Sequence, residues 1–215
     1  MTTDLSILTL SQWLSPAYPV GGFAYSHGLE TAIQYGTIQS AADVQDWLGD
    51  LLAFGSGRND CILFHAAYAC ETDHAVRAVD AIARANVPAA ERLRETALQG
   101  AAFCKTTSAI SGPPLPELTY PVAVGYGAKR LDVSASLAAA MYLQAFTSTL
   151  ISAAVRLVPL GQTEGQAVLS ALSPLCQQIA KDTADMPLDN LQSSCFLSDI
   201  AAMTHETLDH RIFRS

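Results

Sequence analysis

The sequence is poor in charge. Asp, Glu, Lys and Arg make up only 15% of its 215 residues, against roughly 25% in a typical soluble domain. So little charge leaves part of the surface apolar, and apolar patches mark contact sites for other molecules. The twelve basic residues form no cluster and the net charge is -8. A nucleic acid, which binds clustered Lys and Arg, is therefore not an expected partner.

Paired cysteines are also missing. The five cysteines are odd in number, and no two have the CxxC spacing of a redox or metal-binding pair. The first residues, MTTDLSIL, lack the basic segment with which a secretory signal begins. Reduced, buried thiols in a cytoplasmic protein are the simplest interpretation.

Strand signals are almost absent, because neither sustained alternation nor an Asn-Gly or Asp-Gly turn occurs. Apolar residues recur instead at helical spacing. Helices are predicted over residues 4–14, 23–35, about 41–54, 59–69, 73–86, 89–110 and 133–155, and at the C-terminal end. The stretch SGPPLPE, residues 111–117, bends the chain but is too short for a domain boundary. The sequence thus predicts an all-α fold, a single-domain compact helical bundle of residues 1–215.

Several helix details are predicted from local signals. Ser40 followed by Asp43 predicts a capped helix start, and Gly36 a helix stop. Thr163 and Gln166 have the spacing of a capping box. In the first helix, the residues expected to form one apolar set are Leu5, Leu8, Trp13 and Leu14.

Residues 133–155 carry no charge over a length that could span a bilayer. Ser, Thr and Gln side chains interrupt this stretch, and it has no aromatic belt. A central helix buried in a soluble bundle is therefore favoured. The alternative, a membrane-associated helical protein, predicts that solubility depends on detergent.

The sequence does not match the enzyme motifs that its histidine-, glycine- and serine-containing stretches suggest. A zinc protease needs HExxH, but in HETLDH the second histidine, His210, follows His205 at five positions, so the two rings point about 140° apart. Neither a Walker A loop nor a G-x-S-x-G elbow is present. His205 with Asp209, or Glu206 with His210, could still form a two-ligand face. A small metal-dependent hydrolase using these four residues is the alternative function.

The stretch SPAYPVGGFAYSHGLE, residues 15–30, has the composition of a shaped loop. It lacks a catalytic set, because the adjacent Ser26 and His27 would point about 100° apart on a helix. Its prolines stiffen the chain, and Gly21 and Gly22 permit positive φ or close backbone approach, so both are expected to determine shape. Its aromatic rings are typical of interface hot spots. A tight turn between helices is the alternative interpretation.

This stretch resembles the N-terminal signature of the urease accessory protein F family. RLVPLGQTEGQ, residues 156–166, resembles the family's second motif, and SDIAAMTHETLDHRIFRS, residues 198–215, its C-terminal signature. The resemblance implies an all-α, single-domain protein of about ten helices with no catalytic activity and no cofactor. It also implies that residues 199–215 form a partner-binding segment.

The resemblance further implies a cytoplasmic chaperone in the maturation of urease, a nickel enzyme. Such proteins form a homodimer, bind accessory protein D (called H in some organisms) and recruit accessory protein G, a nickel-carrying GTPase, to deliver nickel to apo-urease. Activation of the GTPase and gating of its timing both stay open. An arginine finger would be the device for activation, and Arg156, Arg211 and Arg214 lie within the motifs. No metal ligand set is expected in this chain.

The motifs supply a set of residues expected to bind partners. They are Pro19, Gly21, Gly22, Phe23, Tyr25, His27, Glu30, Gln162, His205, Glu206, Arg211, Phe213 and Arg214. The tail is expected to dock on accessory protein D, with Ile212 and Phe213 buried against that partner. The alternative is that Phe213 caps the core of its own domain.

Overall fold

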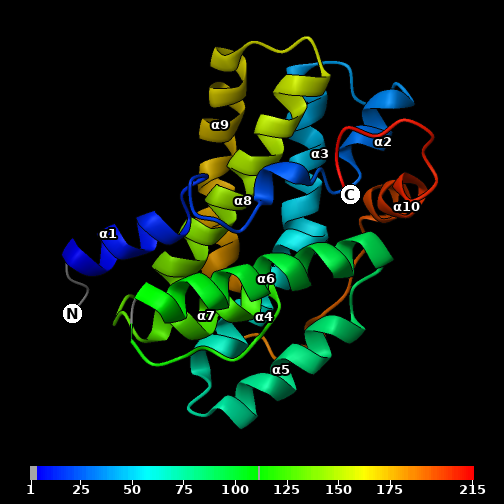
Figure 1. Ribbon diagram of the computed structural model, residues 1–215. Coiled ribbons are helices and arrows are strands. Elements are labelled where there is room, and N and C mark those ends of the chain that lie inside the picture. Colours follow the sequence, from blue (N-terminus) through cyan, green and yellow to red (C-terminus); the bar gives the residue numbers. More distant parts are fainter. Residues whose placement is uncertain (1–3, 111) are drawn as a thin grey trace.

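The computed structural model of the protein describes residues 4–110 and 112–215, so residue 111 of the expected linker lies outside the described part. Within these ranges the chain forms ten α-helices, two short 3-10 helices and no strand, which confirms the all-α prediction (Figure 1). The helices are α1 (Asp4–Trp13), η1 (Gly22–Ala24), α2 (Leu29–Gln34), α3 (Ala41–Phe54), α4 (Ser56–Ala69), α5 (Asp73–Ala85), α6 (Ala90–Ile110), α7 (Tyr120–Lys129), α8 (Ala135–Leu157), α9 (Gln162–Asp182), η2 (Leu188–Asn190) and α10 (Phe196–His205).

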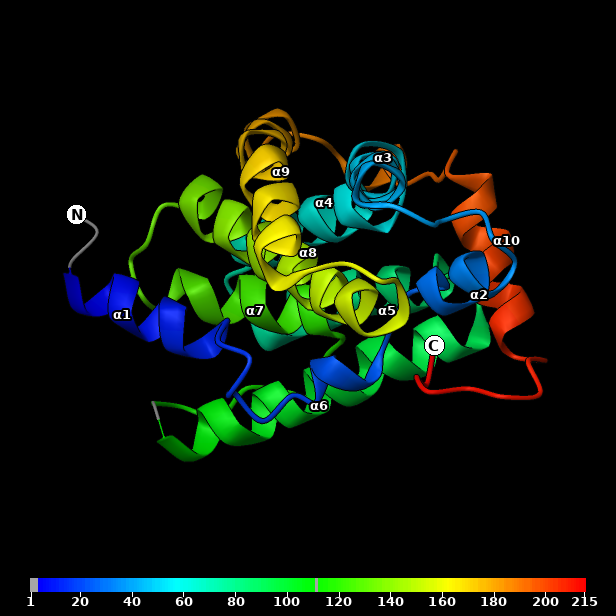
Figure 2. The same cartoon turned by 90° about the horizontal axis from the view of Figure 1, so that it is seen from above.

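The bundle is built around α8. This helix packs along α9 and also contacts α4 and α7, while α4 packs closely against α7 (Figures 1 and 2). By length and composition α8 could cross a membrane, but half of its most apolar window is buried inside the bundle. Its inward face carries Tyr142, Leu143, Leu150 and Ile151. The uncharged stretch is therefore a core helix, as the sequence favours.

The two ends of the described chain lie on opposite sides of the molecule. The N-terminal helix α1 extends from one side, whereas α2, α10 and the C-terminus gather on the other (Figures 1 and 2). Here α10 packs against α2 and α6. The segment after α10, residues 206–215, then returns to the N-terminal motif, and the functional site described below is built at this return.

The first residues of α3 and α9 show whether the predicted helix caps are formed. Ser40 caps α3 as predicted, because its hydroxyl accepts from the Asp43 amide and Asp43 accepts from the Ser40 amide at 2.9 Å. The predicted box at Thr163 is wrong: α9 begins at Gln162, and Glu164 accepts from the Gly161 amide at 2.8 Å. Glu164, the third residue of α9, therefore takes the capping role that was predicted for Gln166.

The apolar set predicted for α1 is only partly right. Trp13 is buried, but Leu5 and Leu8 are exposed by 72% and 66%. The buried partner of Trp13 is Leu10, three positions earlier on the same helical face. The outer face of α1 is therefore apolar and faces away from the core.

Candidate functional site

The N-terminal motif does not form the helix predicted over residues 23–35. Only η1 and α2 are helical, and α2 begins at Leu29. His27 has φ 55° and Gly28 has φ 77°, both in the left-handed region, which no α-helix can include. A Cβ on Gly28 would lie 2.6 Å from the backbone nitrogen of Ala202. The motif therefore makes a sharp turn whose glycine lets α2 and α10 approach closely.

The two glycines singled out from the sequence differ. Gly21 has φ 75°, so its shape-determining role is supported, although a Cβ there would meet nothing within 4 Å. Gly22 does not have positive φ, and a Cβ there would make an ordinary contact of 3.8 Å with Thr149. The turn thus depends on Gly21 and Gly28, and the sequence analysis did not single out Gly28.

The C-terminal segment is hydrogen-bonded to the N-terminal motif through backbone atoms. The Arg214 amide donates to the Ala24 carbonyl at 2.8 Å, and the Ser26 amide donates to the Ser215 carbonyl at 2.6 Å. Phe213, which directly precedes Arg214 and Ser215, is only 5% exposed and belongs to the main apolar core. The expectation that Phe213 is buried by a partner is therefore wrong for this chain, because its own core covers the ring.

Glu30 anchors this segment from inside. Its carboxylate is fully buried and accepts from the backbone amides of Ile212 at 2.7 Å and Phe213 at 2.9 Å. The Nε2 atom of His205 lies 3.1 Å from the same carboxylate. A buried carboxylate needs such donors, since an unpaired buried charge is strongly destabilising.

His205 joins three elements. Its Nδ1 atom lies 2.6 Å from Glu91 on α6, while its Nε2 faces Glu30 on α2. Glu91 also accepts from the Arg211 guanidinium at 2.6 Å. The His205 ring is therefore used in holding the fold together and does not pair with Asp209. Among the described residues, no group of three or more His, Cys, Asp or Glu side chains could hold a metal ion.

A second buried carboxylate, Glu95, lies next to the first site. It accepts from His27 at 2.7 Å, from Gln99 at 2.9 Å, from the Ser215 hydroxyl at 2.8 Å and from Arg92. Burial raises the pKa of Glu95, but the Arg92 guanidinium and His27 outweigh it and lower this pKa to about 2. Glu95 is therefore a permanent negative charge that holds Ser215 in place.

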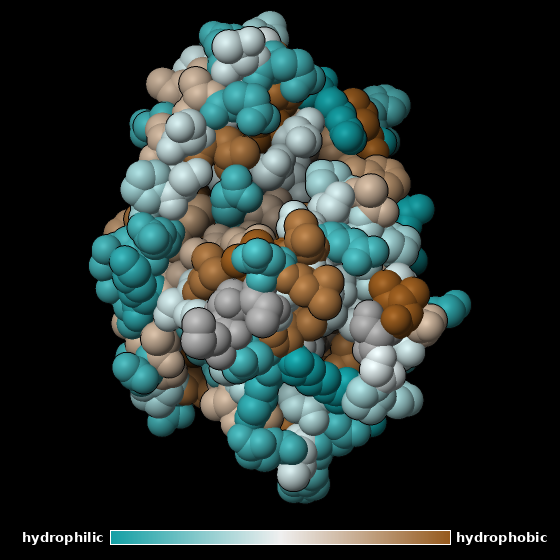
Figure 3. Space-filling model, turned by 90° about the vertical axis from the view of Figure 1, so that its left-hand side faces the viewer, coloured by the Kyte–Doolittle hydropathy of each residue, from teal (hydrophilic) through white to brown (hydrophobic). Residues whose placement is uncertain are grey.

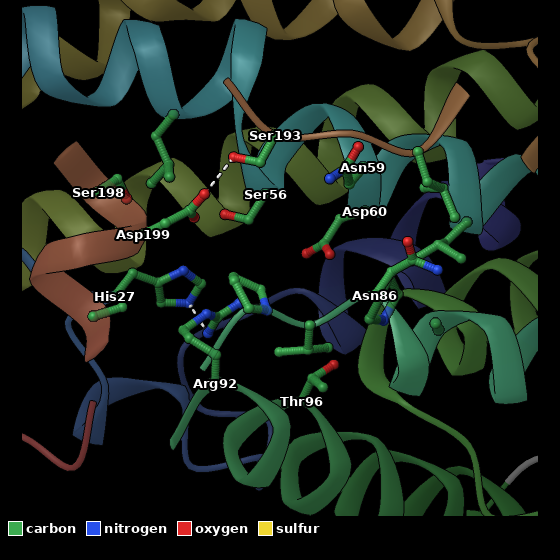
Figure 4. Close-up of a pocket in the computed structure, with 18 of the residues that line it drawn as sticks. His27, Ser56, Asn59, Asp60, Asn86, Arg92, Thr96, Ser193, Ser198 and Asp199 are labelled. Carbon is green, nitrogen blue, oxygen red and sulfur yellow. Dashed lines mark hydrogen bonds between the residues drawn. The ribbon is translucent and has the colours of Figure 1, made fainter. Parts of the chain in front are cut away.

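Two cavities of about 140 Å³ each meet at this cluster. Both are lined by His27, Asp60, Arg92 and Thr96, and Figure 4 shows the first of them. Burial raises the pKa of Asp60 to about 6, against the opposing effects of Arg92 and of the Tyr142 hydroxyl, which donates at 2.8 Å. Burial, followed by the charge of Arg92, lowers the pKa of His27. His27 is therefore neutral at pH 7.

Two exposed surfaces lie around this buried network. The first, here the α10 face, consists of apolar residues exposed by 48–70%: Phe196, Leu197, Ile200 and Met203. Phe54, 56% exposed, lies beside it, since its carbonyl accepts from the Ser194 amide at 3.0 Å. A continuous apolar face of this kind is typical of a helix that docks on another protein.

The second surface, here the motif junction, consists of Phe23, Arg156, Ile212 and Arg214. The Arg156 guanidinium donates to the Phe23 carbonyl at 3.3 Å and lies 5.9 Å above the Phe213 ring. Phe23 and Ile212 are exposed by 66% and 73%, and Arg156 and Arg214 are also exposed. All three sequence motifs therefore contribute to one patch of apolar and cationic side chains.

The expected partner-binding residues divide by burial. Those exposed or half-exposed are Pro19, Gly21, Gly22, Phe23, Gln162, Glu206, Arg211 and Arg214. Those buried within the chain are Tyr25, His27, Glu30, His205 and Phe213. The buried group shapes the surface from beneath. The sequence analysis did not identify Glu91, Arg92 and Glu95. The one signal that could have indicated them is an acidic residue on the inward face of a predicted helix.

Comparison with known proteins decides the family. The UreF family profile matches residues 38–173. A urease accessory protein UreF from Cereibacter sphaeroides is 51% identical over 210 residues, which cover 98% of this chain and 99% of that protein. The chain belongs to the UreF family. Proteins of the same name from Roseobacter denitrificans (51% over 215 residues, 100% and 96% covered) and Ruegeria pomeroyi (46% over 213 residues, 99% and 98% covered) agree.

Membership of the UreF family confirms the resemblance drawn from the three motifs. The protein is therefore a non-catalytic urease accessory protein that takes part in urease maturation. The alternative of a metal-dependent hydrolase is wrong, and the geometry of His205 gives the physical reason: its two ring nitrogens face Glu30 and Glu91.

Proposed function

We propose that this UreF-family protein is a cytoplasmic scaffold that joins accessory protein D (or H) to accessory protein G, the nickel-carrying GTPase, for delivery of nickel to apo-urease. The observation that carries the proposal is the meeting of all three motifs at the motif junction. Both surfaces, the α10 face and the motif junction, consist largely of exposed apolar side chains, with two exposed arginines added at the motif junction. Recognition of other proteins is the chemistry that these surfaces offer.

The α10 face and Ile212 are the proposed docking surface for accessory protein D. Residues 199–215 supply most of it, as expected of a partner-binding segment. Because Phe213 is locked into the core, its neighbour Ile212 is held outward as a rigid apolar anchor. A preorganised anchor loses little entropy on binding, which favours affinity.

Replacement of Ile200 by Glu tests this surface directly. The charge would have to be buried in the complex, so co-purification of accessory protein D should be lost while the melting temperature changes little. Ile82→Glu on α5, where Ile82 is 37% exposed, is the matched control and should retain the partner. Normal capture of accessory protein D by Ile200→Glu would contradict the proposal.

For accessory protein G, we propose gating of its GTPase instead of activation by an arginine finger. An arginine finger must extend from its own protein into the active site of the GTPase, where it contacts the phosphate of the nucleotide. Arg156 is engaged with the Phe23 carbonyl and the Phe213 ring. Arg156→Lys keeps the charge but not the planar group. Gating predicts that this variant lowers nickel transfer without changing the rate of GTP hydrolysis in the complex.

The uncharged outer side of α8 is the proposed homodimer surface. Gln144 and Ser148 line a groove of about 300 Å³ against α1, and the exposed Leu5 and Leu8 lie on α1 itself. Apolar side chains gather on this side of the molecule (Figure 3). Each copy carries a net charge of -8, so a face without charge lets two copies meet with the least repulsion.

Gln144→Glu tests the homodimer. In an isologous contact one substitution places two new carboxylates near each other, so the measured molar mass should fall to that of one chain. Gln178→Glu, on the exposed side of α9, is the control. A Gln144→Glu protein that sediments as the wild type does would remove α8 from the interface.

A further inference from the structure

The buried carboxyl of Asp60, between the two cavities, has no basic side chain to itself. Asp60 on α4 and Arg92 on α6 line both cavities. Asp60 points its carboxyl into the first cavity, toward the side where His27, Arg92 and Thr96 lie (Figure 4). The Asp60 carboxyl accepts a hydrogen bond from the Tyr142 hydroxyl at 2.8 Å. An ionised Asp60 therefore depends on Arg92 for compensation.

Arg92 is already shared. Its guanidinium contacts Glu95 and lies 2.6 Å from His27 Nε2. Glu95 remains ionised because its pKa is about 2, and His27 stays neutral because burial lowers its pKa. Two carboxyl groups thus compete for one guanidinium, and the cluster changes from neutral to singly negative when Asp60 loses its proton.

The titratable and charged groups around Asp60 come from several elements. They are Cys61 beside it on α4, Arg92 and Glu95 on α6, Tyr142 on α8, His27 in the N-terminal motif and Asp199 on α10. Burial raises the pKas of Cys61 and Tyr142, so both stay neutral at pH 7. Burial raises the pKa of Asp60 itself only to about 6, close to neutrality, so this carboxyl can gain or lose its proton near physiological pH.

The same cluster holds the C-terminal segment. Glu95 accepts the Ser215 hydroxyl at 2.8 Å, and the Ser26 amide, next to His27, donates to the Ser215 carbonyl. Arg92 and Glu95 lie three positions apart on α6, so their contact fixes the carboxylate that Ser215 uses. A change in the position of Arg92 therefore affects the tail through one residue, Glu95.

We propose that Asp60 is a proton-operated switch for anchoring the C-terminal segment. When Asp60 is neutral, Arg92 stays on Glu95, and Glu95 holds Ser215. When Asp60 ionises, it draws Arg92 toward itself, the Glu95 carboxylate turns and Ser215 loses its acceptor. Loss of a proton inside the bundle thereby loosens Ser215 and the neighbouring Arg214, while Glu30 still holds the amides of Ile212 and Phe213.

Nuclear magnetic resonance tests the switch in the full chain. The carboxyl carbon of Asp60 and the amide signals of Arg214 and Ser215 are followed from about pH 5 to about pH 8. All three should titrate with one midpoint of about 6. Amide exchange at Arg214, corrected for its intrinsic pH dependence, should accelerate above that midpoint.

Two variants separate Asp60 from the other acids. In Asp60→Asn the titration of the tail amides should disappear, whereas in Asp199→Asn, which removes the other carboxyl of the first cavity, it should persist. A tail titration that survives in Asp60→Asn overturns the proposal. If Asp60→Asn does not fold, the wild-type carboxyl decides: a midpoint below about pH 5, or tail amides that do not follow Asp60, also overturns it.

Discussion

Glu30 and His205 meet inside the protein although 175 positions separate them in the chain. His205 Nε2 lies 3.1 Å from Glu30 Oε2, and both side chains are fully buried. The same carboxylate accepts the amides of Ile212 and Phe213. The N-terminal and C-terminal motifs of the family are therefore two halves of one buried polar site that fixes the direction of the tail.

Glu30→Ala should release the tail. The change leaves His205 and two backbone amides without their acceptor, and loss of one partner of a buried charge typically costs about 3–5 kcal/mol. Chemical denaturation should show this loss of stability, and trypsin should cut faster after Arg211 and Arg214. Glu30→Gln keeps one oxygen acceptor and should lose less. Equal stability of the Ala variant and the wild type would exclude the anchoring role.

Phe213→Ala and Ile212→Ala should affect different properties. Phe213 is 5% exposed, so its truncation should lower the free energy of unfolding by about 3 kcal/mol. Ile212 is 73% exposed, so its truncation should change that free energy by less than about 0.5 kcal/mol yet weaken binding of accessory protein D. Denaturation and pull-down assays measure the two effects. Full partner binding by Ile212→Ala would leave the tail a purely structural element.

Gly28→Ala should destabilise the protein more than Gly21→Ala. Both glycines have positive φ, which costs another residue about 1–2 kcal/mol. Only at Gly28 would the new Cβ also meet a backbone nitrogen at 2.6 Å, which forces α2 and α10 apart and brings the total to about 3 kcal/mol or more. Thermal unfolding of the two variants gives the comparison, and the reverse order would contradict the contact.

Asp60→Asn should stabilise the protein at high pH only. The folded-state pKa of about 6 lies above the unfolded value, so the folded chain binds the proton more tightly. The cost of burying the ionised group is present in full above pH 6 and disappears as the pH falls toward about 4. Asn removes that cost, so the gain should be about 1–3 kcal/mol at pH 8 and vanish at low pH. A gain that is equal at both pH values would point to a cause other than ionisation.

The sequence predicts the bundle well because helical periodicity and capping chemistry are local. The α3 cap at Ser40 and the core position of α8 follow from residues within one or two turns. The helix boundaries predicted near the site are wrong for the same reason, since they were inferred from local signals alone. Nothing within residues 23–35 shows that His27 and Gly28 adopt left-handed angles, since the cause is α10, more than 170 positions away.

The chemistry of the site was only half predictable. The motifs indicate Glu30, His205 and Arg211 as important residues, but their contacts with α6 cannot be seen in any motif. Glu91, which binds both His205 and Arg211, lies outside all three motifs. Asp60 has no local signal at all, because its raised pKa depends on burial inside the bundle, next to Arg92 on α6 and Tyr142 on α8. Long-range pairing of ionisable groups is what sequence patterns lack.

The contact between Ser26 and Ser215 spans 189 positions. Contacts of such long range form late in folding, after the chain between them has been ordered. During synthesis residue 26 leaves the ribosome long before residue 215 is made. A growing chain therefore cannot present the motif junction, and a chain that lacks its last residues presents a defective one.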